Sequence, residues 1–268
     1  MAKNPHIKQL KEKKFYIKML IYGDNGTGKT VFGASAMDCE VCKEVLFVNI
    51  EGGMLSITDR KTLDHWDINE FVEIKDVLKF LQEEEHPYKA VVLDSITELQ
   101  LRSLDAIVKD AMAAPPKGKP RTDEDEIRID DYGKNTVAMR KVLRGFRDLP
   151  MHVIMTALAV ENKDEDGVVT VSPQLTEKMA NSVMGYVDIV AYMHAKKVAK
   201  EGKEELVRSF LFQPYGKFRA KDRTGKLGDF LITPTVQRIM DLANGKLKPT
   251  YFNTPAPAAK TETETEKE

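Results

Sequence analysis

The sequence predicts an α/β fold, with a mainly parallel sheet flanked by helices and an antiparallel β extension toward the C-terminal end. Three observations support it. Short apolar runs bounded by turn residues recur, helical patterns separate them, and after residue 185 the rhythm changes to two strands around a glycine-containing turn. Strands that alternate with helices form parallel sheets covered on both faces, so we expect one domain of this kind.

The expected strands of the parallel sheet are the apolar runs at residues 16–23, 44–51, 89–95 and 151–160. The expected helices are the amphipathic patterns at 76–84, 95–114 and 135–149. Residues 186–214 are typical of two antiparallel strands, and the strand pattern "GDFLI" follows the cationic run 216–226. Two long loops are expected at 114–131 and 161–174, and loops of this length are usually functional or disordered.

Composition indicates a globular protein that does not span a membrane. The chain has 268 residues, is 42% hydrophobic and has a net charge of −1, and it contains no apolar run long enough for a membrane span. We therefore expect a cytoplasmic protein with no membrane partner. We divide the chain into a basic N-terminal segment (1–15), one α/β domain (16–250) and a disordered acidic tail (251–268).

The sequence "GDNGTGKT" matches the phosphate-binding pattern G-x-x-x-x-G-K-[ST] and lies between an apolar strand and a helix-compatible segment. Glycines let the backbone amides point at a phosphate, and the helix N-terminus adds a favourable dipole. The residues expected to bind ATP are Gly23, Asp24, Asn25, Gly26, Thr27, Gly28, Lys29 and Thr30. Lys29 is expected to reach the β- and γ-phosphates, and the Thr30 hydroxyl is expected to bind Mg²⁺.

Two acidic residues stand at the ends of other apolar strands. Asp94 ends "VVLD", where a carboxylate can hold the hydration shell of Mg²⁺ beside the phosphates; a turn or helix cap is the alternative. Glu51 follows "FVNI", where a carboxylate can orient and deprotonate the attacking water. For Glu51, a helix cap or an ordinary loop carboxylate is an equal alternative.

In this order, the three motifs resemble those of the RecA-like ATPases. "FVNIEGGML" is similar to the strand with their catalytic glutamate, and "AVVLDSITEL" is similar to their Walker B strand. Within that group the chain most resembles the short recombination or single-strand annealing proteins of bacteriophages, through "DYGKN", "LPMHVIMTA", "SPQLTEK" and "GYVDIVAYM". The resemblance covers about residues 16–235. It implies homo-oligomers (rings or filaments), and as partners single-stranded DNA and a single-strand-binding protein, in the host cytoplasm.

The run "GKFRAKDRTGK" alternates four cations, Lys217, Arg219, Lys221 and Arg223, which an extended backbone would aim at one face. Its part "KDRTG" resembles the K-N-R-F-G motif of RadA-type relatives, which implies basic residues that reach the nucleotide of the adjacent subunit. Arg223 is the expected finger because guanidinium can bind phosphate oxygens bidentately, and Lys221 would assist as a point charge. A solvated basic face and a DNA-backbone contact are the alternatives.

The chain departs from RecA proteins where they carry an amide switch residue, since it has Thr156 and Ala157 there. Thr156 can still hydrogen-bond a γ-phosphate or the attacking water, but coupling between nucleotide and DNA does not follow. The DNA-facing loops of the family correspond in position to 114–131 and 161–174. The basic residues there that suit phosphate contact are Lys117, Lys119 and Arg121. A helical stripe is interpreted first as a solvated face and second as a nucleic-acid contact; it consists of Arg140, Arg144 and Arg147.

These features together predict a Mg²⁺-dependent ATPase, stimulated by single-stranded DNA, that acts in DNA recombination or annealing. Two other classes remain open at this level. One is a P-loop phosphotransferase with a small acceptor, and the other is a non-hydrolysing, nucleotide-gated scaffold that does not act on DNA. No base-reading residue distinguishes ATP from GTP.

Overall fold

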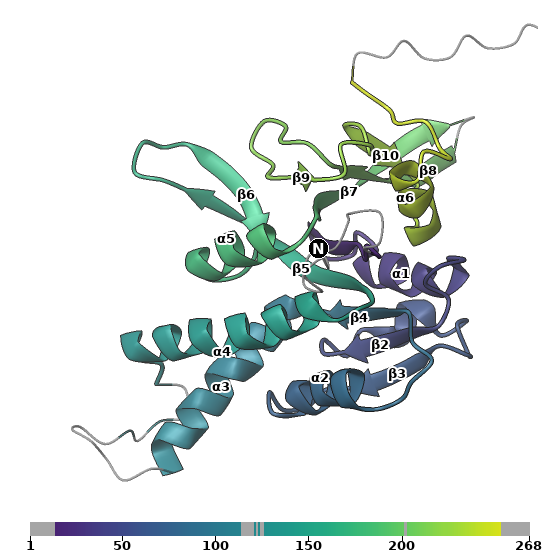
Figure 1. Cartoon of the computed structure of the whole chain (residues 1–268). Helices are drawn as coiled ribbons and strands as arrows, with labels where there is room; N and C mark the ends of the chain where they lie inside the picture. The colour runs from purple at the N-terminus through teal and green to yellow at the C-terminus, as the bar shows by residue number, and fades with distance from the viewer. Residues whose placement is uncertain (1–13, 114–120, 122, 124–125, 201–202, 253–268) are drawn as a thin grey trace, which may run out of the picture.

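The computed structural model of the chain describes residues 14–113, 121, 123, 126–200 and 203–252 (Figure 1). The strands are β1 (Lys18–Gly23), β2 (Val45–Asn49), β3 (Asp64–Asp67), β4 (Ala90–Asp94), β5 (His152–Lys163), β6 (Val169–Pro173), β7 (Ile189–Lys200), β8 (Lys203–Leu211), β9 (Lys221–Asp222) and β10 (Phe230–Ile232). The α-helices are α1 (Lys29–Ala34), α2 (Glu73–Glu83), α3 (Ile96–Ala113), α4 (Ile129–Asp148), α5 (Glu177–Tyr186) and α6 (Val236–Ala243). Short 3₁₀ helices span Ser35–Asp38 and Met54–Ile57.

The central sheet confirms the predicted fold class. Its strands pair in the order β10-β8-β7-β1-β5-β4-β2-β3, with β6 added to β5 and β9 added to β7. The pairs from β7 through β1, β5, β4 and β2 to β3 are all parallel, whereas β7, β8 and β10 pair antiparallel. The parallel strands therefore end together at one edge, which is where a ligand site forms in open α/β sheets.

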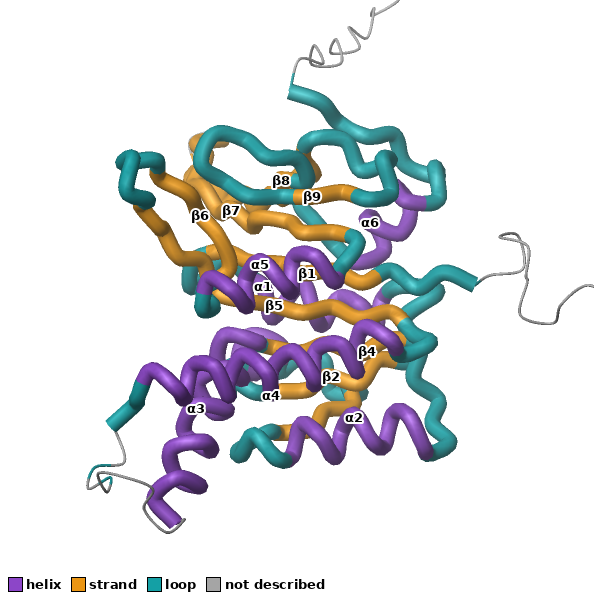
Figure 2. The backbone as a smooth tube through the Cα atoms, turned by 60° about the vertical axis from the view of Figure 1, so that its left-hand side comes forward, coloured by secondary structure: helices purple, strands orange, loops and turns teal. Residues whose placement is uncertain are grey.

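Both faces of the sheet are covered by helices (Figure 2). Along β1, Leu20 and Tyr22 pack on the face that carries α2, α3, α4 and α5, while Met19 and Ile21 pack on the face that carries α1 and α6. This alternation follows from the two-residue period of a strand. Because both faces of β1 are buried, each of its residues must be apolar or must have its polar groups hydrogen-bonded. The parallel strands thus read as continuous apolar runs in the sequence.

One of the two predicted long loops is wrong. Residues 161–174 extend β5 and return as β6, so that Glu161 pairs with Val171 and Lys163 with Val169 in an antiparallel hairpin. The turn closes at Gly167, whose φ of 81° suits glycine. The acidic start of the segment hid this strand, because a hairpin arm that faces water needs few apolar residues. Figure 1 shows the hairpin projecting from the rest of the sheet.

The cationic run 216–226 pairs as a strand only at Lys221–Asp222, on β7. Its four alternating cations nevertheless all contact either the hairpin or α5. The contacts run from Lys217 to the Glu161 carboxylate, from Arg219 to the Asn181 side chain, from Lys221 to the Met184 carbonyl and from Arg223 to the Gly185 carbonyl. Two of the cations therefore bind carbonyls at the C-terminal end of α5, where the helix dipole favours positive charge.

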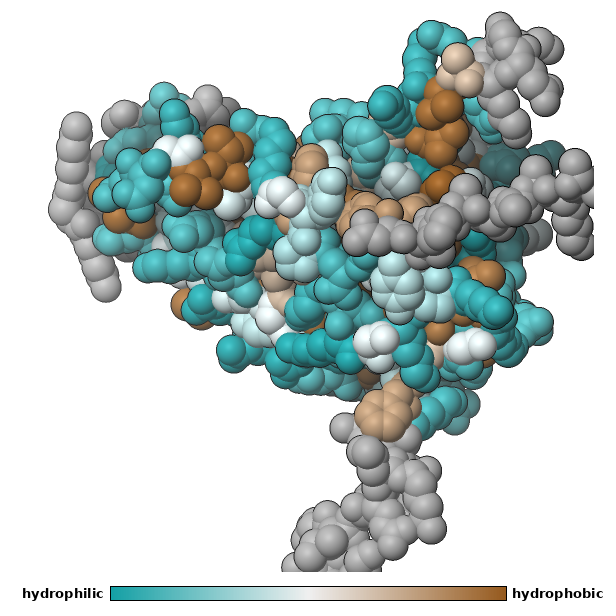
Figure 3. Space-filling model, turned by 90° about the horizontal axis from the view of Figure 1, so that it is seen from above, coloured by the Kyte–Doolittle hydropathy of each residue, from teal (hydrophilic) through white to brown (hydrophobic). Residues whose placement is uncertain are grey.

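The visible surface is mostly hydrophilic, with hydrophobic residues in small separate groups (Figure 3). Among the described residues, no helix combines the length and the apolar character that a membrane crossing requires. The folded chain continues to Phe252, whose ring stacks on Phe230 with centroids 5.4 Å apart. Most of the predicted basic segment and acidic tail, residues 1–13 and 253–268, lies outside the described residues.

His152, at the start of β5, makes folding stability depend on pH. The Ile17 amide donates to His152 Nδ1 at 3.1 Å, and burial, with the charges of Lys18 and Lys14, lowers the pKa of His152 from 6.5 to about 4. Between these values only the unfolded chain takes up the proton, so stability falls as the pH falls through this window. We expect the wild type to lose about 2 kcal/mol more than His152→Gln between pH 7 and pH 5. Urea unfolding at both pH values measures this; the exposed His194→Gln should behave as the wild type, and equal losses in all three would contradict it.

Candidate active site

The turn between β1 and α1 has the backbone geometry of a phosphate-binding loop. β1 ends at Gly23 and α1 begins at Lys29. Gly26 and Gly28 have φ angles of 73° and 100°, in the left-handed region that glycine tolerates. The loop amides that find no hydrogen-bond acceptor among the described residues are those of Asn25, Gly26, Gly28, Lys29 and Thr30. Such a row of free N–H groups at a helix N-terminus is an anion-binding arrangement.

Lys29 is buried inside this loop. Its Nζ donates to the carbonyls of Gly23 at 3.0 Å and Asp24 at 2.9 Å. Burial lowers the pKa of Lys29, and the carboxylates of Glu51, Asp94 and Asp24 oppose that shift. A bound phosphate would give this ammonium a stronger, charged partner than two neutral carbonyls.

Asp94 lies opposite the loop, at the end of β4, and is 2% exposed. Thr30 Oγ1 donates to Asp94 Oδ2 at 2.7 Å, so the two predicted metal ligands are in contact. Thr156 donates its hydroxyl to Asp94 Oδ1. Burial raises the pKa of Asp94 and these two hydrogen bonds oppose the rise. Thr156 thus orients Asp94, and its contact with a γ-phosphate stays a prediction.

Glu51 lies two residues after the end of β2 and is exposed. The amides of Ile50 and Glu51 both donate to the Asp94 carbonyl, at 2.7 and 3.1 Å. The bonding of this segment to β4 therefore continues past the end of β2 and fixes the backbone of Glu51 beside Asp94. The negative charge of Glu51 acts to raise the pKa of both Lys29 and Asp94.

The ends of β1, β4 and β2 thus bring Lys29, Thr30, Asp94 and Glu51 to one edge of the sheet. Residues 16–224 match the family model described as AAA domain. The chain belongs to the AAA domain family. It is an AAA-type P-loop ATPase domain, a class that binds and hydrolyses nucleoside triphosphates.

Comparison with solved structures finds the flagellar accessory protein FlaH from Methanocaldococcus jannaschii. It is 11% identical to this AAA domain over 75% of this chain and 79% of that chain, with a TM-score of 0.37. A likeness at this level carries no argument about function. No curated protein matches the chain.

The site of the AAA domain fits a magnesium triphosphate. The Thr30 hydroxyl and the Asp94 carboxylate are hard oxygen ligands, the kind Mg²⁺ prefers, and Mg²⁺ usually takes only one or two protein ligands beside phosphate oxygens and water. Thr30 and Asp94 are therefore the residues that would hold the ion, which neutralises charge on the phosphates when bound.

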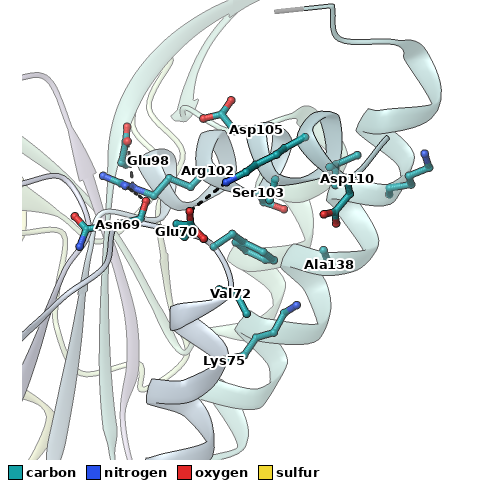
Figure 4. A pocket seen from close by; sticks show the side chains of 15 residues that line it. Asn69, Glu70, Val72, Lys75, Glu98, Arg102, Ser103, Asp105, Asp110 and Ala138 are labelled. Atoms are coloured by element: carbon teal, nitrogen blue, oxygen red, sulfur yellow. Dashed lines mark hydrogen bonds and ion pairs between the residues drawn. The ribbon is translucent and has the colours of Figure 1, made fainter. Parts of the chain in front are cut away.

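Arg102, on α3, is a site residue that the sequence analysis missed. One terminal nitrogen donates to the Ile50 carbonyl at 2.8 Å and the other donates to the Asn69 carbonyl. Figure 4 shows Arg102 and Glu98 on one wall of a pocket of about 740 Å³ between α2, α3 and α4. The only signal in the sequence is the i, i+4 spacing of Glu98 and Arg102, whose charged groups lie 3.4 Å apart. Arg102 thereby holds the peptide that precedes Glu51.

Arg102→Met should impair hydrolysis more than binding, because Ile50 and Asn69 lose their donor and the Glu51 backbone is freed. We expect kcat to fall about 3- to 10-fold with KM changed less than about 2-fold, the effect of one or two lost hydrogen bonds. Steady-state kinetics measure both parameters. Lys75→Met, which removes a cation from the same pocket, is the control. A drop in affinity at unchanged kcat would show that Arg102 does not act through Glu51.

Arg223, the predicted finger, lies far from the phosphate-binding loop of its own chain. Its amide donates to the Asp188 carbonyl at 3.0 Å, just before β7. In the register, Ile189 pairs with Met19 and Met193 pairs with Gly23, so the loop is four residues, about 13 Å, further along the sheet. Arg223 cannot serve this loop from within the same subunit.

Lys221, the predicted assisting cation, binds the C-terminal end of α5. Its Nζ donates to the Met184 carbonyl, and burial, followed by the charge of Arg223, lowers its pKa. The side chain of Arg223 remains about half exposed, at 51%, although it contacts Gly185 and Asp188. Of the two residues, Arg223 is therefore freer to act on another molecule, and the roles of both remain predictions.

The basic residues predicted for DNA contact are bonded within the protein where the structure describes them. Arg121 is buried in an ion pair with Asp131 at 2.7 Å, so the prediction that it contacts phosphate is wrong; Lys117 and Lys119 lie outside the described residues. The arginine stripe on α4 packs against α5: Arg140 donates to the Ser182 hydroxyl at 3.1 Å, Arg144 donates to the Tyr186 hydroxyl at 3.1 Å, and Arg144 and Arg147 lie over the Tyr186 ring. The stripe therefore joins two helices.

Proposed function

We propose that this AAA domain is a Mg²⁺-dependent, RecA-like ATPase of the kind that bacteriophages encode, which assembles with further copies and acts on single-stranded DNA in recombination or annealing in the cytoplasm. The observation that carries the ATPase part is the contact of Thr30 with Asp94 beside Lys29 and Glu51, at the ends of three strands. The order of the later sequence motifs supports the DNA part.

Each residue has a distinct task in the proposed reaction. The loop amides and Lys29 bind the β- and γ-phosphates, and Thr30 and Asp94 hold the ion. Glu51 accepts a proton from the attacking water, and Thr156 and Arg102 keep Asp94 and the Glu51 backbone in place. A cation from outside the subunit would stabilise charge on the transferred phosphoryl oxygens.

The position of Arg223 supports a site that needs a second copy. Arg223 lies beyond the reach of its own loop, and its side chain is half exposed on a different edge of the sheet. An arginine supplied by the adjacent subunit would make turnover depend on assembly. A single-strand-binding protein would act as a further partner in the same reaction.

Steady-state hydrolysis at several protein concentrations, with and without single-stranded DNA, tests this function. The rate per subunit should rise with protein concentration and rise again with DNA. Turnover that ignores both, with phosphoryl transfer to an acceptor other than water, would instead indicate a phosphotransferase. Absence of any turnover in the wild type would indicate a nucleotide-gated scaffold.

Mixing two inactive variants tests the shared site. Lys29→Ala removes the phosphate cation and Arg223→Ala removes the finger, so each variant alone should hydrolyse ATP at least about 100-fold more slowly. In a mixture, an intact loop from one variant can meet an intact finger from the other. We expect the mixture to recover a substantial part of the wild-type rate, and no recovery would remove Arg223 from the reaction. Lys226→Ala, an exposed cation of the same run, should stay active.

A further inference from the structure

Arg208 of β8 reaches the phosphate-binding loop from the C-terminal antiparallel part of the sheet. Its Nε donates to the Thr27 carbonyl at 3.0 Å, across a separation of 181 residues. The backbone of Arg208 is held on both sides, because it pairs with Ala195 of β7 and its carbonyl accepts the Thr233 amide at 2.8 Å. The backbone of Arg208 is therefore held by its neighbours, and its Nε is held by Thr27.

The loop and Arg208 fit closely together. A Cβ atom at Gly28 would lie 2.7 Å from Arg208 Nε, so the arginine fills the space where any other residue would place its side chain. Gly28 also has a φ of 100°, which only glycine adopts readily. On the same strand, the Phe210 ring packs edge-on against Phe32 of α1, with centroids 4.7 Å apart. β8 thus contacts both the loop and the helix that follows it.

The terminal nitrogens of Arg208 form no hydrogen bond with any described residue. Within the part of the chain that the structure describes, the guanidinium bonds only through Nε, to Thr27. Two N–H₂ groups with positive charge therefore stand beside a loop whose own amides lack acceptors. Guanidinium groups bind phosphate oxygens bidentately, which makes a polyphosphate the ligand of matching charge and geometry.

We propose that Arg208 is a nucleotide-binding residue of its own subunit: Nε positions the loop through Thr27, and the terminal nitrogens bind phosphate oxygens of the nucleotide held there. This inference rests on the proposed function only in that a nucleoside triphosphate binds the loop. It differs from the role of Arg223, which requires a second copy. Arg208 acts on ground-state binding, whereas Arg223 acts on the transferred group.

The test is a titration of fluorescent ATP and ADP analogues, with Mg²⁺, into the wild type, Arg208→Met, Arg208→Lys and Lys196→Met. Lys196 is the matched control, since it is exposed and lies next to the Arg208 pair on β7, with its side chain toward the opposite face. We expect Arg208→Met to weaken ATP binding about 10- to 100-fold and ADP binding less, the effect of losing charged hydrogen bonds. Arg208→Lys should recover part of the loss, and Lys196→Met should bind as the wild type.

The kinetic counterpart separates binding from a structural role. In Arg208→Met, KM should rise by a similar factor while kcat changes less than about 3-fold. Wild-type ATP affinity in Arg208→Met would overturn the inference. An equal loss of ATP affinity in Arg208→Lys and Arg208→Met, together with a lowered melting temperature, would also overturn it, because that result indicates a structural role. If Arg208→Met does not fold, Arg208→Lys and Arg208→Gln decide by the same comparison. Failure of the wild type itself to bind ATP would instead reject the proposed function.

Discussion

Asp94→Asn should lower kcat/KM for Mg-ATP about 1,000-fold, or about 4 kcal/mol of transition-state stabilisation. The carboxylate accepts hydroxyl hydrogen bonds from Thr30 and Thr156 and is the only buried acid beside the loop among the described residues. An asparagine carries no charge for the metal, and its amide nitrogen would face one of the two hydroxyls. Steady-state hydrolysis over a Mg²⁺ titration measures the loss.

The pH dependence of this Mg²⁺ titration provides a second readout. Burial raises the pKa of Asp94, so protons compete with Mg²⁺ at pH values where an ordinary aspartate is already ionised. The Mg²⁺ concentration for half-maximal rate should therefore fall as the pH rises in the wild type. Asp105→Asn, an exposed carboxylate on α3, is the control and should match the wild type. Hydrolysis by Asp94→Asn within about 3-fold of the wild type would contradict the metal role.

Glu51→Gln should lower kcat about 100- to 10,000-fold while ATP affinity changes less than about 2-fold. The reason is that the amides of Ile50 and Glu51 bond to the Asp94 carbonyl, so the backbone stays in place and only the proton acceptor is lost. Loss of one negative charge near Lys29 and Asp94 should slightly favour binding of the negatively charged triphosphate. Single-turnover hydrolysis separates this chemical step from binding.

The exposed carboxyl of Glu84, at the end of α2, offers the control variant Glu84→Gln. It removes the same charge at a distance from the loop and should leave kcat unchanged. Unaltered turnover in Glu51→Gln would mean that another group activates the water, and Glu51 would then be a loop carboxylate, the alternative left open by its position in the sequence. An equal loss in kcat and affinity would indicate a disturbed loop.

The sequence contains the parts of the site that depend on local geometry. The spacing of glycines in "GDNGTGKT" sets the positive φ angles of Gly26 and Gly28, and the apolar runs set which strands are buried on both faces. Parallel strands end at the same edge of the sheet, so motifs at the ends of two strands predict that Thr30 and Asp94 lie close together, as they do. These features could be read without knowledge of any distant contact.

Sequence patterns predict secondary structure less well where a segment faces water or packs against a single neighbour. The acidic first arm of the hairpin 161–174 is typical of a loop, and β3, α5 and α6 are short elements with weak sequence patterns. The sequence shows the positive charge of the run 216–226, but the four alternating cations in it bind the hairpin or α5. A cation in the sequence does not reveal whether its anion is a ligand or the protein itself.

The sequence by itself determined the α/β fold class, the phosphate-binding loop and the acidic residues that face it, since each depends on a few consecutive residues. Only the tertiary structure decided how Thr156, Arg102 and Arg208 are used, because their partners Asp94, Ile50 and Thr27 lie 62, 52 and 181 residues away. It also decided that Arg121 is buried and that Arg223 is beyond reach of its own loop. Hydrogen-bond partners across such separations depend on how the helices and the sheet pack together, and the local periodicity of the sequence does not predict them.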